Sequence, residues 1–258
     1  MDGGRRVVLV TGGGGGLGRA MAQSFAGAGH DVVICGRNEK SLESSAAEIR
    51  QHGGAVRHFV CDVTRKIDVE RLAGEISQQL GAVQVLINNA GLARAAGFLE
   101  MSDSLWEEIL QTNLTGAYNC CKLFLGGMLQ ARWGRIINIA STTAKVGYPY
   151  VTAYTASKHG VLGLTRSLAL ETARRGVTVN AICPGYLNNE LTHENARRMA
   201  KQTGKKVEDI LALFAASAPQ KRLIEPEEVA SLALLLAGEK SAGITGQAIN
   251  VDGGAVMV

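Results

Sequence analysis

Proline is scarce in this sequence, and long apolar runs are missing from it. Only 4 of the 258 residues are proline. The longest apolar segments are far shorter than the roughly 20 residues with which a helix spans a bilayer. The N-terminal segment also has no long apolar stretch before a cleavage-type site. We therefore expect a cytoplasmic protein that has neither a signal peptide nor a membrane partner.

Cysteine is present, but not in a pattern that would hold a metal ion. The number of cysteines is odd, and neither a C-x-x-C pair nor a Cys/His ligand spacing occurs. Several cysteines lie inside apolar runs, where a free thiol behaves as a small hydrophobic group. We expect no disulfide, no bound metal and a reducing compartment. The five are Cys35, Cys61, Cys120, Cys121 and Cys183.

Charge of one sign is nowhere concentrated. The chain has 27 Lys and Arg against 23 Asp and Glu, a formal net charge of +4. Because no basic run is long enough to follow a nucleic acid, we expect no nucleic-acid partner. The small excess is weak evidence for an anionic ligand such as a phosphate-bearing cofactor, and ordinary solvated surface accounts for most of it.

Glycine is abundant, with 32 residues, and apolar runs alternate with helical patterns along the whole chain. Nearly continuous apolar strands separated by helices predict a parallel sheet covered on both faces. Right-handed crossovers then give an α/β fold, a single-domain Rossmann-type doubly wound sheet of about seven strands over residues 1–258. The predicted strands are residues 6–10, 31–35, 56–60, 83–87, 135–140, 177–183 and 247–251. The predicted helices are residues 16–28, 38–52, 66–80, 104–130, 152–175 and 227–236.

Residues 187–223 interrupt this alternation, because they contain helical patterns but no predicted strand. Insertions at strand ends often bind ligands, so this segment is predicted to be a substrate-binding lid. Its basic balance would suit a phosphate-bearing acyl carrier such as coenzyme A. Alternatively, the charges form the solvated faces of two helices, while an inward-facing apolar set lines a pocket for a hydrophobic acyl or ring substrate. That set is Ile210, Leu211, Leu213 and Phe214.

The first predicted strand runs directly into a glycine-rich turn at residues 11–18. Glycine leaves no Cβ between backbone and ligand, and the following helix offers free N–H groups to a pyrophosphate. A flexible linker is the alternative, but linkers do not lie between a buried strand and an amphipathic helix. After the second strand comes Arg37, with no carboxylate before Glu39. Arg37 therefore favours NADP over NAD, unless it is only a solvated loop residue.

Tyr154 and Lys158 lie four residues apart, which places them on one face of a helix. An ammonium one turn away should stabilise the phenolate, lower the tyrosine pKa and make the pair a proton donor and acceptor. Ser141 follows the fifth predicted strand, where such sheets bind ligands, and Asn113 could hydrogen-bond deeper in the site. Taken singly, each feature has a structural explanation. The spacing of Tyr154 and Lys158 can occur by chance, Ser141 can be a helix cap or turn residue, and Asn113 can mark a helix irregularity.

In their order along the chain, these segments resemble the short-chain dehydrogenase/reductase family over nearly the whole length. The segments that carry the resemblance are Thr11-Gly-x-x-x-Gly16-x-Gly18, Cys61-Asp62-Val63, Asn88-Asn-Ala-Gly91, Asn113, Ser141, Tyr154-x-x-x-Lys158, Pro184-Gly185 and the closing residues 246–254.

The resemblance implies a site for both the reaction and a nicotinamide cofactor. Tyr154 would be the general acid/base, Ser141 would bind the reacting oxygen, Lys158 would tune Tyr154, and Asn113 would anchor a water in a proton relay to Lys158. The implied cofactor contacts, together with Arg37, are Gly12, Gly16, Leu17, Gly18, Asp62, Val63, Asn89, Ala90, Gly91, Tyr154, Lys158, Pro184 and Gly185.

The family resemblance also implies an activity and an assembly. We expect an NAD(P)-dependent enzyme that interconverts a ketone and a secondary alcohol, with a 3-oxoacyl or 3-hydroxyacyl substrate, and a homo-oligomer that is a tetramer or a dimer. Polyol, sugar and aromatic-alcohol dehydrogenases share every motif quoted, and a catalytically silent dinucleotide sensor is the rival from another class. Two positions depart from the family pattern: Gly15 stands where many NADP-using members have Arg or Lys, and Asn189 where Thr is common.

Overall fold

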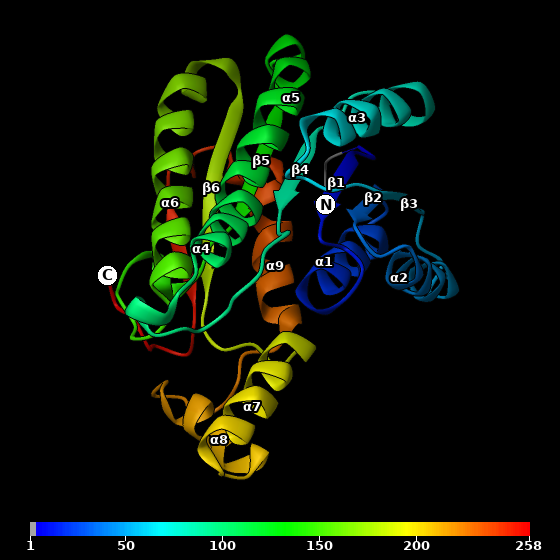
Figure 1. Cartoon of the computed structure of the whole chain (residues 1–258). Helices are drawn as coiled ribbons and strands as arrows, with labels where there is room; N and C mark the ends of the chain where they lie inside the picture. The colour runs from blue at the N-terminus through cyan, green and yellow to red at the C-terminus, as the bar shows by residue number, and fades with distance from the viewer. Residues whose placement is uncertain (1–3) are drawn as a thin grey trace.

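Seven apolar segments pair in parallel to form one sheet in the computed structural model, which describes residues 4–258 (Figure 1). The strand order is β3-β2-β1-β4-β5-β6-β7, so the chain starts in the middle and builds outward in both directions. This confirms the predicted doubly wound fold, and every predicted strand lies within two residues of an observed one. The strands are β1 (Val7–Thr11), β2 (Asp31–Gly36), β3 (Val56–Val60), β4 (Val85–Asn88), β5 (Gly134–Ile139), β6 (Val177–Pro184) and β7 (Ala248–Val251).

Alternate residues of each central strand enter two separate cores, one on each face of the sheet. In β1, Val8 and Val10 belong to one core, and Val7 and Leu9 to the other. Because both faces are covered by helices, every residue of β1 is buried. The apolar run therefore reflects burial on both sides.

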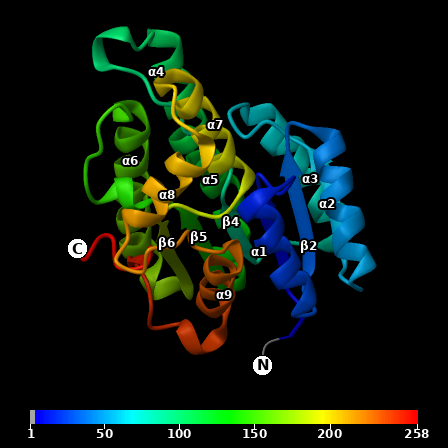
Figure 2. The same ribbon diagram turned by 90° about the horizontal axis from the view of Figure 1, so that it is seen from below.

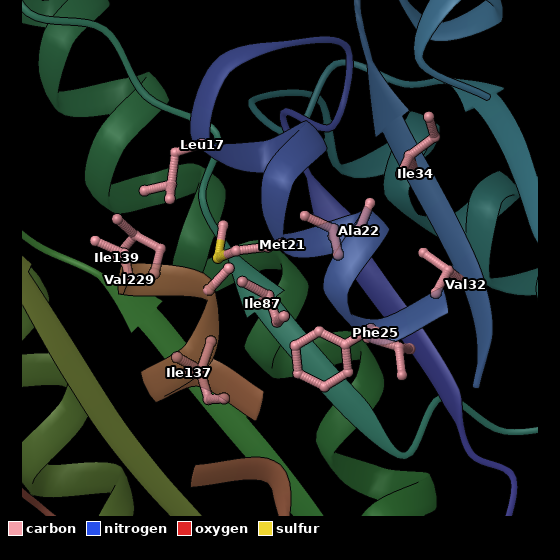
Figure 3. Packing of buried hydrophobic residues seen from close by; sticks show 14 of the residues in the cluster. Leu17, Met21, Ala22, Phe25, Val32, Ile34, Ile87, Ile137, Ile139 and Val229 are labelled. Carbon is pink, nitrogen blue, oxygen red and sulfur yellow. The ribbon is translucent and has the colours of Figure 1, made fainter. Parts of the chain in front are cut away.

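The helices divide between the two faces as right-handed crossovers require. One face carries α1 (Gly16–Gly27), α2 (Glu39–Gln51) and α9 (Pro226–Ala237), and Figure 2 shows α1 and α9 side by side. Phe25 and Met21 of α1 pack there against Ile87 and Ile137 of the sheet (Figure 3). The other face carries α3 (Lys66–Leu80), α5 (Gly116–Ala131) and α6 (Thr152–Thr172).

The single long helix predicted over residues 104–130 is interrupted in its first half. It consists of α4 (Asp103–Leu110), a π-helical turn (Gln111–Thr115) and α5. The N–H of Gly116 donates to the carbonyl oxygen of Gln111, five residues back. This extra residue in the turn moves Asn113 into the interior, where it is 2% exposed. The predicted irregularity at Asn113 is therefore present.

Residues 187–223 form two helices that lie together beyond one end of the strands (yellow to orange in Figure 1). They are α7 (Glu190–Thr203) and α8 (Val207–Ala216), which share a small core of Ala196, Ala200 and Ile210. The two ends of the segment are joined, because Leu187 and Ile224 form a parallel bridge. Phe214 and Leu211 pack on the small core as predicted, but Leu213 is 52% exposed and does not.

Within residues 4–258, no helix is long and apolar enough to span a membrane. The same residues contain no group of three or more His, Cys, Asp or Glu side chains placed to share a metal ion. All five cysteines lie in the described part of the chain, and each is a buried free thiol.

Candidate active site

The glycine-rich turn between β1 and α1 leaves an open, uncapped helix end. Gly12 has a φ of +68°, and the N–H groups of Gly12 and Gly13 donate to the carbonyl oxygen of Cys35. A Cβ atom on Gly18 would lie 2.7 Å from the side-chain nitrogen of Asn89, so only glycine fits. Gly15 precedes α1 and provides no side-chain cap. The first N–H groups of the helix therefore remain available to an anion such as a pyrophosphate.

Asn89, directly after β4, holds this turn against the middle of the sheet. Its side-chain nitrogen donates to the carbonyl oxygens of Thr11 (3.0 Å) and Gly12 (3.3 Å). The hydroxyl of Thr11 in turn accepts the N–H groups of Asn89 and Ala90, both at 3.0 Å. These bonds bring the segment after β4 beside the glycine turn. Two of the segments that the family resemblance assigns to the cofactor therefore adjoin.

The ends of β2 and β3 carry the residues predicted to meet the adenosine part of the cofactor. Arg37 is exposed, and within residues 4–258 its side chain makes neither a hydrogen bond nor an ion pair. The Asp62 carboxylate accepts the N–H and the hydroxyl of Thr64, at 3.0 and 2.8 Å. Val63 is buried, and Gly116 leaves room for its side chain. The guanidinium of Arg37 is thus free to bind an added phosphate.

Tyr154 and Lys158 lie in the first turns of α6, beside the end of β5. The Lys158 ammonium is 4% exposed, donates to the carbonyl oxygen of Ile139 (2.6 Å) and lies 5.7 Å from the centroid of the Tyr154 ring. Burial lowers the pKa of Lys158 to about 8. Burial also raises the pKa of Tyr154, while the nearby Ser141 hydroxyl acts in the opposite direction. The prediction that Lys158 lowers the tyrosine pKa is therefore wrong for the chain itself, because burial dominates.

Ser141 follows β5 and points its hydroxyl at two neighbours. It caps a short 3-10 turn (Thr142–Ala144), because its oxygen accepts the N–H of Thr143 at 3.2 Å. It also interacts with the Tyr154 hydroxyl strongly enough to oppose the rise in that pKa. The cap and the catalytic position considered for this serine therefore coexist, and the cap fixes the direction of the hydroxyl.

The Asn113 side chain makes three hydrogen bonds within the protein. Its oxygen accepts the N–H of Leu92 (2.8 Å), and its nitrogen donates to the Leu92 carbonyl (3.0 Å) and to the Ser157 hydroxyl (3.0 Å). Ser157 is fully buried and donates to the carbonyl oxygen of Tyr154 at 2.7 Å. These bonds join the segment after β4, the π-helical turn and α6. Both N–H groups of the Asn113 amide are thus committed, and a relay water would have to use its oxygen or a main-chain group.

At the end of β6, Pro184 and Gly185 run close against the C-terminal segment. A Cβ atom on Gly185 would lie 3.0 Å from the Cβ of Asp252, so a side chain there would force the two segments to move apart slightly. Asn189, which stands where Thr is common in the family, caps α7 by accepting the N–H of Thr192 at 3.0 Å. Its amide nitrogen lies close to Gly16 and can donate to a ligand.

Sequence reasoning missed Ser157, Tyr148 and Tyr186. Ser157 lies between the motif residues Tyr154 and Lys158, where its spacing carries no signal of its own. Tyr148 and Tyr186 line a cavity that adjoins the predicted Ser141 and Gly185 segments. Tyr148 and Tyr186 come together at this cavity only through the fold of two separate loops, which no local sequence pattern predicts.

The comparisons with known proteins decide the family. A family model described as short chain dehydrogenase matches residues 6–200. The chain belongs to the short-chain dehydrogenase family. It is thus an oxidoreductase of that family, and the predicted family membership is confirmed.

Full-length relatives of this short-chain dehydrogenase are known. A protein of Streptomyces coelicolor described as a candidate ketoacyl reductase is 38% identical over 96% of this chain and 96% of its own length. A D-beta-hydroxybutyrate dehydrogenase of Cupriavidus necator is 34% identical, with 96% and 97% coverage. The crystal structure of a variant actinorhodin polyketide ketoreductase with NADPH superposes with a TM-score of 0.95 at 38% identity, covering 97% of both chains.

Proposed function

We propose that this short-chain dehydrogenase reduces the ketone of 3-oxoacyl compounds to a secondary alcohol, with NADPH as the hydride donor. The observation that supports it most directly is the geometry around Tyr154. Its phenol, the Ser141 hydroxyl and the Lys158 ammonium meet at the carboxyl end of the sheet, beside the glycine turn. This is where doubly wound sheets bind dinucleotides and their substrates.

In this proposal, Ser141 and Tyr154 both hydrogen-bond the carbonyl oxygen of the substrate. The bound nicotinamide supplies the hydride to the carbonyl carbon, and the Tyr154 hydroxyl donates its proton to the oxygen. Because burial raises the pKa of Tyr154, the phenol keeps its proton at neutral pH and is prepared to act as an acid. The buried Lys158, with its pKa near 8, replaces that proton from the inside of the site.

The cofactor would lie along the ends of the strands, from the glycine turn to the end of β6. The available N–H groups at the start of α1, near Gly16, Leu17 and Gly18, would bind the pyrophosphate. Asp62 and Val63 would line the adenine, and the segment from Asn89 to Gly91 would line the nicotinamide ribose. Pro184 and Gly185 would pass over the nicotinamide ring.

The 3-oxoacyl substrate is proposed because relatives with ketoacyl or hydroxybutyrate activity in their names match over 96% of this chain. The hydroxybutyrate relative favours a second candidate, the oxidation of a 3-hydroxyacyl compound at the same site. Polyol, sugar and aromatic-alcohol oxidation remain alternatives within the family. The raised pKa of Tyr154 favours the proposed reduction, because a protonated phenol can donate to the substrate oxygen at neutral pH, whereas oxidation needs the phenolate.

Tyr154→Phe tests the chemistry. The variant keeps the ring but lacks the proton, so reduction of a 3-oxo ester should fall by at least about 100-fold. Cofactor binding, followed by the fluorescence of bound NADPH, should stay within about threefold, because the ring still packs in place. Substantial remaining activity at unchanged cofactor affinity would show that another group supplies the proton.

Arg37→Ala tests the cofactor preference. Removing a charged hydrogen-bond donor from the added phosphate should weaken NADPH by about tenfold or more and leave NADH almost unchanged. The measurement is the dissociation constant of each cofactor at low and high salt. A wild type that binds NADH more tightly than NADPH would remove NADP from the proposal.

Three further expectations stay predictions. The segment 187–223 is proposed to close over the substrate, since both its ends lie beside the proposed nicotinamide position. The chain is proposed to form a tetramer or a dimer, which light scattering of the purified protein measures. It is also proposed to work in the cytoplasm.

A further inference from the structure

One cavity of this structure lies against the end of β6 and beneath the segment 187–223. Its wall combines Thr142 and Gly185 of the body with Phe214 of α8 and with the side chains of Tyr148 and Tyr186. The cavity adjoins the reacting centre, because its lining includes Thr142, directly after Ser141, and Gly185, directly after β6. A substrate held by Ser141 and Tyr154 would therefore direct the rest of its chain toward the opening of this cavity.

Aromatic rings are concentrated at this cavity. The chain has only five phenylalanines, five tyrosines and two tryptophans, and Tyr148, Tyr186 and Phe214 line this one space. The rings of Tyr186 and Phe214 stack with centroids 4.3 Å apart and planes within 5° of parallel. Tyr186 is nevertheless 42% exposed, so its ring is not simply part of a core. The pair offers flat π surfaces at the opening of the cavity.

The charged groups around the same cavity are already neutralised within the protein. Arg222 makes two hydrogen bonds to Glu228, at 2.5 and 2.9 Å. The two carboxylate oxygens of Asp252 accept the N–H groups of Gly254 (3.0 Å) and Val256 (2.9 Å). A carboxylate or phosphate entering here would compete with these bonds. The rest of the lining combines aromatic rings with uncharged hydroxyl groups such as that of Thr142.

The basic residues of the segment 187–223 do not change this conclusion. Arg197 pairs with Glu190, and Lys221 donates to the main-chain carbonyl of Ala216 at 3.0 Å. Arg222 is paired as described. These three charges are thus paired within the protein, and the other basic residues of the segment are exposed on α7 and the turn after it. The aromatic lining is the feature next to the cavity that can distinguish substrates.

We infer that Phe214 and Tyr186 are specificity-determining residues, and that this enzyme prefers ketones whose chain carries a flat, uncharged ring beyond the reacting carbonyl. This inference rests on the proposed function and adds the class of substrate to it. The ring lies against the exposed face of Tyr186, and Phe214 stacks on Tyr186 and so holds that face in position. Stacking distinguishes an aromatic ring from a saturated ring of similar volume, which burial of apolar area alone does not.

The test compares two 3-oxo ethyl esters whose carbon 4 carries either a phenyl or a cyclohexyl group. The methylene separates ring from ketone, so the two carbonyl groups are equally reactive. The wild type should use the phenyl ester about fivefold to tenfold better in kcat/KM, the advantage expected of one aromatic pair. Phe214→Leu keeps the apolar volume without the π surface, and it should reduce this ratio to within about twofold of one. Tyr186→Leu should act in the same direction.

The matched control is Leu213→Ala, which changes the exposed neighbour of Phe214 on the same helix. It should leave the ratio of the two esters unchanged. Melting temperatures of all three variants separate a folding defect from a change in specificity, and two independent ring replacements keep the test valid if one fails to fold.

Equal use of both esters by the wild type would overturn this inference, and so would an equal loss for both in Phe214→Leu. Activity with the unsubstituted ethyl 3-oxobutanoate separates a failure of the ring preference from a failure of the proposed function. If the wild type reduces it but shows no ring preference, only the specificity inference fails. If no 3-oxo ester is reduced with NADPH or NADH, the proposed function fails as well.

Discussion

Ser157→Ala removes a single buried oxygen from the site, and we expect it to lower kcat. The hydroxyl of Ser157 accepts one N–H of the Asn113 side chain and donates to the main chain of Tyr154. Through Asn113 it is connected to both main-chain groups of Leu92, directly after Gly91. The network thus links the proposed cofactor segment to the helix that carries the proton donor.

The magnitude follows from what the substitution leaves behind. Alanine leaves one N–H of Asn113 buried without a partner, because both residues are at most 2% exposed. A buried unpaired donor costs about 1–3 kcal/mol in the free energy of unfolding. The side chain can avoid this cost only by turning, which would move Leu92 or α6. A displacement of a reacting group by about 1 Å can cost up to about 100-fold in rate, so we expect a loss in kcat of about tenfold to 100-fold.

The assay is the reduction of a 3-oxo ester, with kcat and KM measured separately, next to the matched variant Thr172→Val. Thr172 lies at the other end of α6, and its buried hydroxyl donates to the carbonyl oxygens of Leu168 (2.9 Å) and Val177 (3.1 Å). Both variants lose a buried hydroxyl from one helix, so both should lose stability. Only Ser157→Ala should lower kcat, with KM for the ketone within about threefold.

A second comparison tests whether Ser157 acts through Asn113. If it does, the double variant of Asn113→Ala with Ser157→Ala should be no slower than Asn113→Ala alone, because the second change removes a contact already lost. Two outcomes would refute the reasoning: a Ser157→Ala enzyme with normal kcat and reduced stability, or losses that multiply in the double variant.

Two other predictions follow from the pKa of Lys158 and from the space at Gly15. Burial lowers the pKa of Lys158 to about 8, so above that pH the unfolded chain binds a proton at this site that the folded chain has lost, and Lys158 should contribute a rise in the free energy of unfolding with pH. Buried thiols with a raised pKa, such as Cys120 and Cys121, act in the opposite direction in both proteins, so denaturant unfolding from pH 7.5 to 9.5 should give a more positive slope in the wild type than in Lys158→Met; parallel curves would contradict it. A Cβ atom on Gly15 meets nothing within 4 Å, and its φ of 172° is open to any residue. Gly15→Arg should therefore tighten NADPH over NADH by about threefold to tenfold at low salt, and an unchanged ratio of dissociation constants would count against the phosphate position.

The order of strands and helices could be predicted because both cores follow from patterns within single segments. A strand such as β1 is buried on both faces and therefore reads as an unbroken apolar run. The glycine turn could also be predicted, because the surroundings of Gly12 and Gly18 leave no room for a side chain and the sequence therefore has glycine there. These signals are local, so the sequence contains them whatever the rest of the chain does.

The features that the sequence did not determine depend on contacts between distant segments. A helix irregularity at Asn113 was one of two interpretations of that residue, but the bonds to Leu92 and Ser157 that accompany the π-helical turn come from elsewhere in the chain. The pKa of Tyr154 could be judged from its lysine neighbour alone, but burial, a property of the folded chain, reverses the direction. The spacing of the motif therefore identifies the pair without determining its proton affinity.

The way the segment 187–223 joins the body has a consequence for how such enzymes diverge. Its two ends leave and rejoin at neighbouring points, where the N–H of Ile224 donates to Tyr186 (2.9 Å) and the N–H of Asn188 donates to Ile224 (2.8 Å). Its helices have their own small core. Closing a longer or shorter loop across the same two points adds little free energy. Recombination between related genes can therefore replace this segment as a cassette, so that selectivity evolves while the redox machinery beneath it is inherited intact.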